Sequence, residues 1–78
     1  MRNNPFVTIC ILLDGGIYQQ YAAMDLIKKE LLGPCPPHKL NRYKELFRFF
    51  YTDNSILLEH KHEIQDIIVS LEEKHGIH

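Results

Sequence analysis

The chain has 78 residues, of which 45% are apolar and 24% are charged, and its formal net charge is −1. This length leaves room for one domain, residues 1–78, and the composition excludes a disordered chain. The near-zero net charge excludes a strong overall preference for nucleic acid or for acidic partners. The charge is unevenly distributed, however, with +3 over residues 38–52 and −4 over residues 53–78.

The stretch PFVTICILL, residues 5–13, predicts a buried β-strand. It is rich in β-branched and aromatic residues, and its two alternating faces are both mostly apolar: Val7, Ile9, Ile11 and Leu13 against Phe6, Thr8, Cys10 and Leu12. A strand with two apolar faces belongs inside a covered sheet. It therefore requires strand partners elsewhere in the chain.

Residues 17–32 predict a helix. Apolar side chains recur there at intervals of three and four residues, at Ile17, Tyr21, Met24, Ile27 and Leu31. This spacing forms one apolar stripe on a helix whose other positions are largely polar. Gly33 and Pro34 mark the end of the helix, since proline cannot continue it.

Residues 39–60 are ambiguous, because the helical period and the strand period fit equally well. With helical period, one face holds Leu40, Tyr43, Phe47 and Phe50; with a period of two, Phe47, Phe49 and Tyr51 share a face. A hairpin at 46–59, turning at Asp53-Asn54, supplies the partners that the first strand needs. We therefore expect this hairpin, preceded by a short helix around 40–44.

The last segment predicts a second helix, with an apolar stripe at Ile64, Ile67, Ile68 and Leu71 and with Gly76 at its end. The expected order is β-α-β-β-α. This is an α+β fold in which two helices pack on one face of a three-stranded mixed sheet. The alternative is a mostly α-helical fold with one strand.

A +3 segment beside a −4 segment, next to a sheet edge with free backbone groups, favours association with another chain. We expect a small non-enzymatic intracellular interaction module, a regulator or inhibitor that binds another protein or forms a homodimer. Interface energy concentrates in aromatic and arginine side chains, so the expected partner-binding residues are Arg42, Tyr43, Lys44, Arg48 and Phe49. No spacing in the sequence indicates a nucleophile with a positioned base.

Single-stranded nucleic acid is the alternative ligand. Aromatic rings that stack on bases, next to cations that meet phosphates, are typical of such sites. The basic and aromatic segment 38–51 contains both kinds of side chain.

Two cysteine and histidine pairs have the close spacing of zinc ligands, Cys35 with His38 and His75 with His78. A rival pair, His60 and His62, would present both rings on one face of a strand. Zinc is the one cofactor that the sequence suggests, and it would stabilise a small domain.

The cellular compartment is expected to be the cytoplasm. Two cysteines, Cys10 and Cys35, are too few for a secreted disulfide scaffold. The longest apolar run, Ile9 to Leu13, is far shorter than a membrane span of about 20 residues, and no export signal is recognisable.

Overall fold

The computed structural model describes residues 4–76, and every regular element in this range is an α-helix. The four helices are α1 (Pro5–Leu13), α2 (Ile17–Leu32), α3 (Pro37–Phe49) and α4 (Ser55–His75). The predicted α+β fold with a three-stranded sheet is therefore wrong, and so is the single strand of its alternative.

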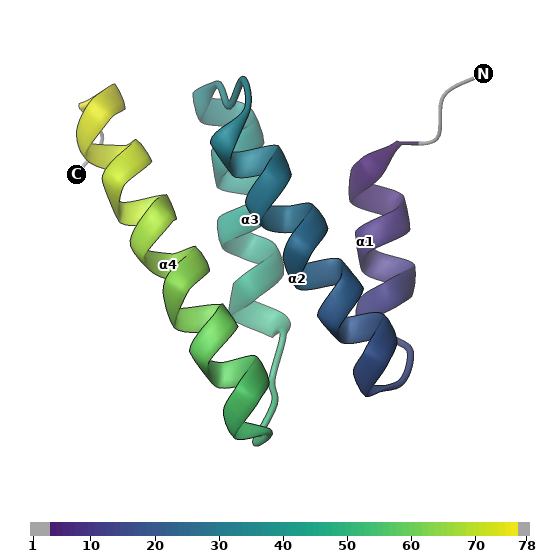
Figure 1. The fold of residues 1–78 in the computed structure, drawn as a ribbon. Coiled ribbons are helices and arrows are strands. Elements are labelled where there is room, and N and C mark those ends of the chain that lie inside the picture. The colour runs from purple at the N-terminus through teal and green to yellow at the C-terminus, as the bar shows by residue number, and fades with distance from the viewer. Residues whose placement is uncertain (1–3, 77–78) are drawn as a thin grey trace.

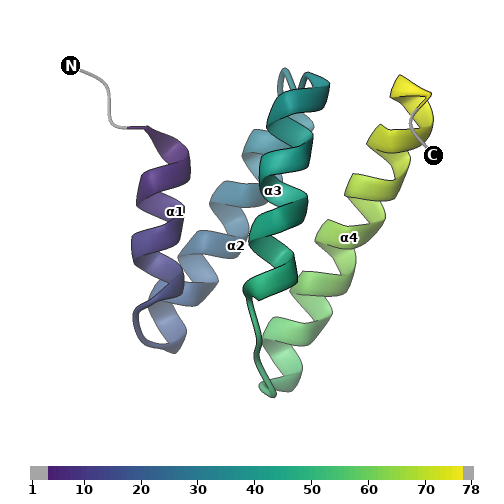
Figure 2. The same ribbon diagram turned by 180° about the vertical axis from the view of Figure 1, so that it is seen from behind.

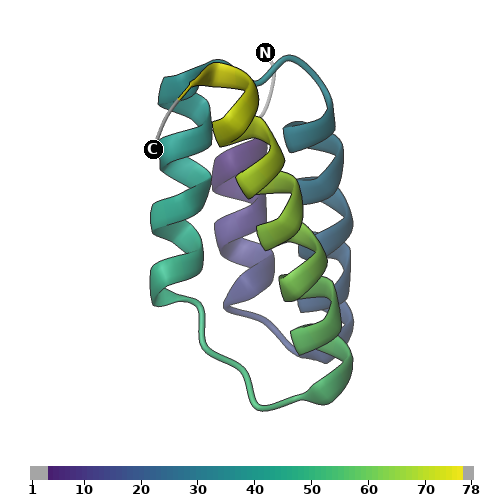
Figure 3. The same cartoon turned by 90° about the vertical axis from the view of Figure 1, so that its left-hand side faces the viewer.

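The helices alternate in direction along the chain and form a flattened bundle with extents of 36 × 35 × 18 Å (Figure 1). α2 packs against α1 on one side and against α4 on the other. Seen from behind, α3 lies in front of α2, between α1 and α4 (Figure 2). In the side view α4 lies over the space between α2 and α3, with α1 behind it (Figure 3). On the side shown in Figure 2, α3 therefore lies between α1 and α4.

The predicted strand at residues 5–13 is helix α1. The Asn4 side chain accepts a hydrogen bond from the Phe6 amide at 2.9 Å, and Pro5 occupies the first turn, where its missing N–H costs nothing. The helix turns Ile9 into the core and leaves Ile11 outside, although both would share one face of a strand. The Asn-Pro start is the sequence signal that the strand interpretation passed over.

The predicted hairpin at 46–59 is also absent from the described residues. α3 continues to Phe49, and α4 begins at Ser55. Asn54, expected in a hairpin turn, instead caps α4: its side chain accepts hydrogen bonds from the amides of Ile56 at 3.1 Å and Leu57 at 3.4 Å. With α1 a helix, no unpartnered strand remains, and the reason for preferring the hairpin disappears.

The two predicted helices are confirmed as α2 and α4, and α4 ends at Gly76 in the left-handed conformation (φ 71°). They are joined by a polar contact as well as by the core. Lys28 of α2 donates to the Glu63 carboxylate at 2.9 Å and to His60 Nδ1 at 2.8 Å. An ammonium group can only donate, so His60 Nδ1 is the acceptor here.

One apolar core joins all four helices. Its members are Ile9, Ala23, Met24, Ile27, Leu31, Cys35, Leu40, Tyr43, Phe47, Leu57, Ile64 and Ile68. Residues 4–76 include no helix with both the length and the apolar character needed to cross a membrane.

Candidate functional site

The five residues predicted to bind a partner all lie on α3, but the helix turns them in different directions. Tyr43 is only 2% exposed, and its ring meets the edge of Phe6 of α1, with the ring centroids 5.5 Å apart. Burial is the main cause that raises the pKa of Tyr43 to about 12, with Glu30 nearby adding to it. Tyr43 therefore joins α3 to α1 inside the protein and offers no ring to a partner.

The cations of α3 also differ in their surroundings. Lys44 donates to Glu72 of α4 at 2.6 Å, and Arg42 lies over the Phe6 ring at 5.0 Å from its centroid. Lys39 pairs with Glu30 at 3.1 Å. Arg48 is exposed and makes no ion pair within residues 4–76. The basic segment of the sequence is thus largely used to hold the helices together, and Arg48 is its most available charge.

A first groove, which we call the α1–α3 groove, lies between the C-terminal ends of these two helices. It has a volume of about 200 Å³ and is lined by Cys10, Leu13, Asp14, Leu46, Phe49 and Phe50. Asp14 is its single charged lining residue. Phe49 is 85% exposed at one rim, and Ile11 of α1, beside the lining residue Cys10, is 68% exposed. The α3 side of this groove therefore presents an exposed aromatic side chain to solvent.

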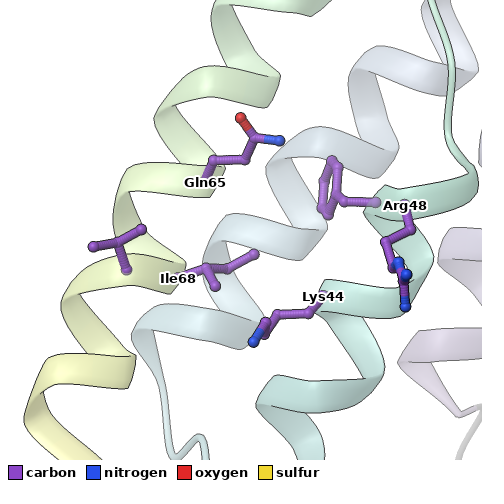
Figure 4. Close-up of a pocket in the computed structure, with 6 residues that line it drawn as sticks. Lys44, Arg48, Gln65 and Ile68 are labelled. Atoms are coloured by element: carbon purple, nitrogen blue, oxygen red, sulfur yellow. The ribbon is translucent and has the colours of Figure 1, made fainter. Parts of the chain in front are cut away.

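A second groove, the α3–α4 groove, lies on the other side of α3. It has a volume of about 360 Å³ and is lined by Lys44, Phe47, Arg48, Gln65, Ile68 and Val69 (Figure 4). Phe47 and Ile68 are each 5% exposed and form its floor, whereas Lys44 and Arg48 stand on the α3 side and Gln65 on the α4 side. This groove combines an apolar floor with a basic rim.

Cys35 and His75, one residue from each of the first two predicted zinc pairs, lie at the same end of the bundle. His75 Nε2 lies 2.8 Å from the backbone carbonyl oxygen of Cys35. Because a carbonyl only accepts, this ring nitrogen carries the proton. The Cys35 thiol is buried, and burial raises its pKa, which favours the neutral thiol over the metal-binding thiolate. The contact between Cys35 and His75 is thus a hydrogen bond from the ring of His75 to the backbone of Cys35.

The other candidate ligands do not gather around this contact. His38 is exposed in the first turn of α3, and His78 lies outside the described residues. His60 and His62 are two positions apart on helix α4, so their rings point to different sides. Within residues 4–76 no three histidine, cysteine or acidic side chains form a group that could hold a metal. The zinc site predicted from Cys35, His38, His75 and His78 stays a prediction.

Three exposed apolar residues were not among the predicted site residues: Val7, Ile11 and Val69, of which Val69 lines the α3–α4 groove. Val7 and Ile11, four residues apart, share the outward face of α1. The sequence contained a signal for them, because a nine-residue helix that is apolar nearly all round cannot turn every apolar side chain into one core. The strand interpretation hid this signal by assigning both faces to a sheet.

Comparison of the chain with protein-family models, with curated proteins and with solved structures finds no match.

Proposed function

We propose that this chain is a non-enzymatic protein-interaction module, a regulator or inhibitor of the protein that it binds, and that the α1–α3 groove is its docking surface. The observation that carries the proposal is the large apolar side chain of Phe49, which lines the groove and is 85% exposed, beside lining residues that are mainly apolar. Contiguous exposed apolar surface on a small protein is typical of interaction sites. Aromatic side chains contribute strongly when a partner buries them.

The chemistry of the groove favours the apolar face of a helix as the ligand. α1 and α3 run in the same direction and form the two walls, and the lining is apolar except for Asp14 at the end of α1 and the thiol of Cys10. Amphipathic helices bind by laying an apolar face into such a groove. Burial of the exposed apolar area contributes about 25 cal/mol per Å² to the binding free energy before the costs of association.

The test is affinity capture with the whole chain as bait, followed by quantitative mass spectrometry. We expect Phe49→Asp to abolish capture of the partner. Tyr18→Asp is the matched control, because Tyr18 is an equally exposed aromatic residue that does not line the α1–α3 groove. Captured proteins that respond equally to both changes, or a wild-type chain that captures nothing, would contradict the proposal.

Single-stranded nucleic acid is the second candidate ligand. Phe49 and Tyr51 are almost fully exposed and flank the end of α3, where Arg48 is also exposed. Rings of this kind can stack on bases while the guanidinium group meets a phosphate. In the described structure Tyr43 and Phe47 are buried, so the stacking surface is smaller than the sequence suggested.

Salt separates the two candidates. For a labelled random single strand with two phosphate contacts, affinity falls about sevenfold between roughly 50 and 200 mM salt, because counterions are released. An apolar contact in the α1–α3 groove is much less sensitive. Fluorescence anisotropy that shows no binding at tens of micromolar protein, at the lower salt concentration, excludes the nucleic-acid candidate.

We place this function in the cytoplasm. The support is the cysteine number, because Cys10 and Cys35 are fewer than secreted disulfide scaffolds of this size carry.

A further inference from the structure

We propose that the α3–α4 groove is a two-fold symmetric interface, and that its occupant is a second copy of this chain. This surface is distinct from the α1–α3 groove, so either proposal can fail without the other. Two features of the α3–α4 groove support a second copy as its occupant: an exposed side chain next to a hollow, and opposite charges on the two helices. The small size of the protein is a third argument.

The groove has a hollow and a protrusion side by side. Phe47 and Ile68 form its floor, and Val69 on the α4 side is 51% exposed. A two-fold axis makes each residue of a patch contact the partner's patch reciprocally. With the axis through the groove, Val69 of each copy enters the groove of the other, so that one patch provides both the protrusion and the hollow.

The charges beside the groove have opposite signs on the two helices. α3 places Lys44 and Arg48 at the rim, and because Lys44 is paired with Glu72 of its own chain, Arg48 is the charge that remains available there. On α4, Asp66 and Glu73 are exposed, and they lie three residues before and four residues after Val69, on the same side of the helix. Within residues 4–76, neither acid is part of an ion pair, and the same is true of Arg48.

The two-fold axis makes the charges of α3 and α4 complementary between the two copies. It places α3 of one copy opposite α4 of the other, so that each basic rim meets an acidic side. Over the whole helices, α3 carries four cations and one acid, whereas α4 carries five acids and two cations. Complementary charges of this kind select the partner and its register. A second copy of the same chain provides an acidic side for the basic rim and a basic rim for the acidic side.

The size of the protein allows such a dimer and favours it. The folded chain exposes 5,520 Å², and a standard interface covers roughly 800 Å² on each partner. The interface would therefore take about one seventh of the surface of each copy. Domains this small bury too little apolar surface to be very stable alone, and association adds to the buried area.

The first experiment measures the oligomeric state of the full chain by sedimentation equilibrium over a range of concentrations. We expect a monomer–dimer equilibrium that Val69→Glu weakens at least about tenfold, because it removes the apolar protrusion and adds a charge beside Asp66 and Glu73. Tyr18→Asp is the matched control, because Tyr18 is an exposed aromatic residue of α2 that lines neither groove, and it should leave the dissociation constant unchanged. Val69 is half exposed, and circular dichroism verifies that the variant folds.

The second experiment uses charge reversal. One variant carries Arg48→Glu on α3, and the other carries both Asp66→Lys and Glu73→Lys on α4. Each variant places like charges across the interface, which should weaken its homodimer about tenfold. A mixture of the two variants should form a heterodimer, since opposite charges then meet on both sides of the axis. Lys29→Glu and Asp25→Lys, both at exposed positions of α2, are the controls and should not change association.

The outcomes separate the possible occupants. Native mass spectrometry that detects the heterodimer in the mixture and little homodimer of either variant supports the proposal. A wild-type chain that is still monomeric at about 100 µM, where even a weak dimer is populated, would overturn it. A dimer that Phe49→Asp breaks and Val69→Glu leaves intact would also overturn it, because the second copy would then occupy the α1–α3 groove.

Discussion

Helices α1 and α4 pack on opposite sides of α2, yet their outward faces are unlike each other. α4 has 21 residues, one apolar stripe, and an outward face that carries Glu59, Asp66 and Glu73. α1 has 9 residues, and its outward face carries Val7 and Ile11. The residue types on the outward face of a helix reflect what that face contacts, and most of the outward face of α4 contacts water. For α1 an apolar outward face fits the proposed partner.

The two helices also differ in how they are attached. α4 is held to α2 by the Lys28 contacts with His60 and Glu63 as well as by buried apolar residues. α1 is held by Ile9 in the core and by Phe6 against Tyr43 and Arg42 of α3. Most of the binding of α1 to the bundle therefore comes from apolar and aromatic packing.

The largest effect should come from the core residue of α1. Ile9→Ala removes a side chain that is 0% exposed and should lower the free energy of unfolding by about 2–4 kcal/mol. Ile11→Ala, at the outward face, should change it by less than about 0.5 kcal/mol. Urea unfolding measures both values. Equal losses would contradict the helix, because only a strand places Ile9 and Ile11 on the same face.

The contact between α1 and α3 should become visible at high pH. The pKa of Tyr43 is raised to about 12 in the folded protein, whereas it is about 10 in the unfolded chain. Burial of the neutral ring therefore contributes fully to stability below about pH 10, and this contribution is lost as the pH rises from about 10 to 12. The total loss is about 3 kcal/mol, because a pKa difference of about two corresponds to about 1.4 kcal/mol for each unit. Unfolding measured between about pH 8 and 12 should show this loss in the wild type relative to Tyr43→Phe. The same pH profile in both proteins would show that α1 does not cover Tyr43.

Cap substitutions compare the helix starts directly. Asn54→Ala should destabilise α4 by about 1 kcal/mol, and Asn4→Ala should have a similar effect on α1, because each side chain accepts a hydrogen bond from a free amide. Replacement by glycine should cost only about a few tenths of a kcal/mol at either site. Thermal unfolding provides the measurement. No effect at Asn4 would mean that α1 does not start as a capped helix.

The smallest effect concerns the ion pair between α2 and α4. The hydrogen bond from Lys28 is the main cause that lowers the pKa of the Glu63 carboxyl group. The pair therefore contributes to stability above the ordinary carboxyl pKa, and this contribution is lost as pH falls through the lowered value. NMR titration of the Glu63 carboxyl carbon should show the low pKa in the wild type and its return toward the ordinary value in Lys28→Met. If the pKa of Glu63 is the same in that variant, the ion pair between Lys28 and Glu63 does not form in solution.

Periodicity predicted α2 and α4 because each has one buried stripe and one polar face. It failed for α1, where apolar residues occupy the buried and the exposed positions alike. Local pattern can distinguish a helix from a strand only when the two faces differ in polarity. The error then propagated, because a buried strand needs partners, and residues 46–59 were assigned to supply them.

The candidate site was predictable in part. The basic and aromatic character of α3 is evident in the sequence, and Arg48 and Phe49 are indeed exposed. The burial of Tyr43 could not be read from the sequence, since it depends on Phe6, 37 positions earlier in the chain. The two grooves likewise depend on how α3 sits between α1 and α4.

The sequence by itself determined two amphipathic helices, their ends, and the separation of positive from negative charge along the chain. Each of these follows from residues close together in the sequence, where side-chain spacing and capping act. Only the tertiary structure decided that residues 5–13 are helical, that Tyr43 is buried, and that Val69 stands beside a hollow. These features arise from contacts between distant segments, because the free energy of burying an apolar side chain depends on which helix covers it.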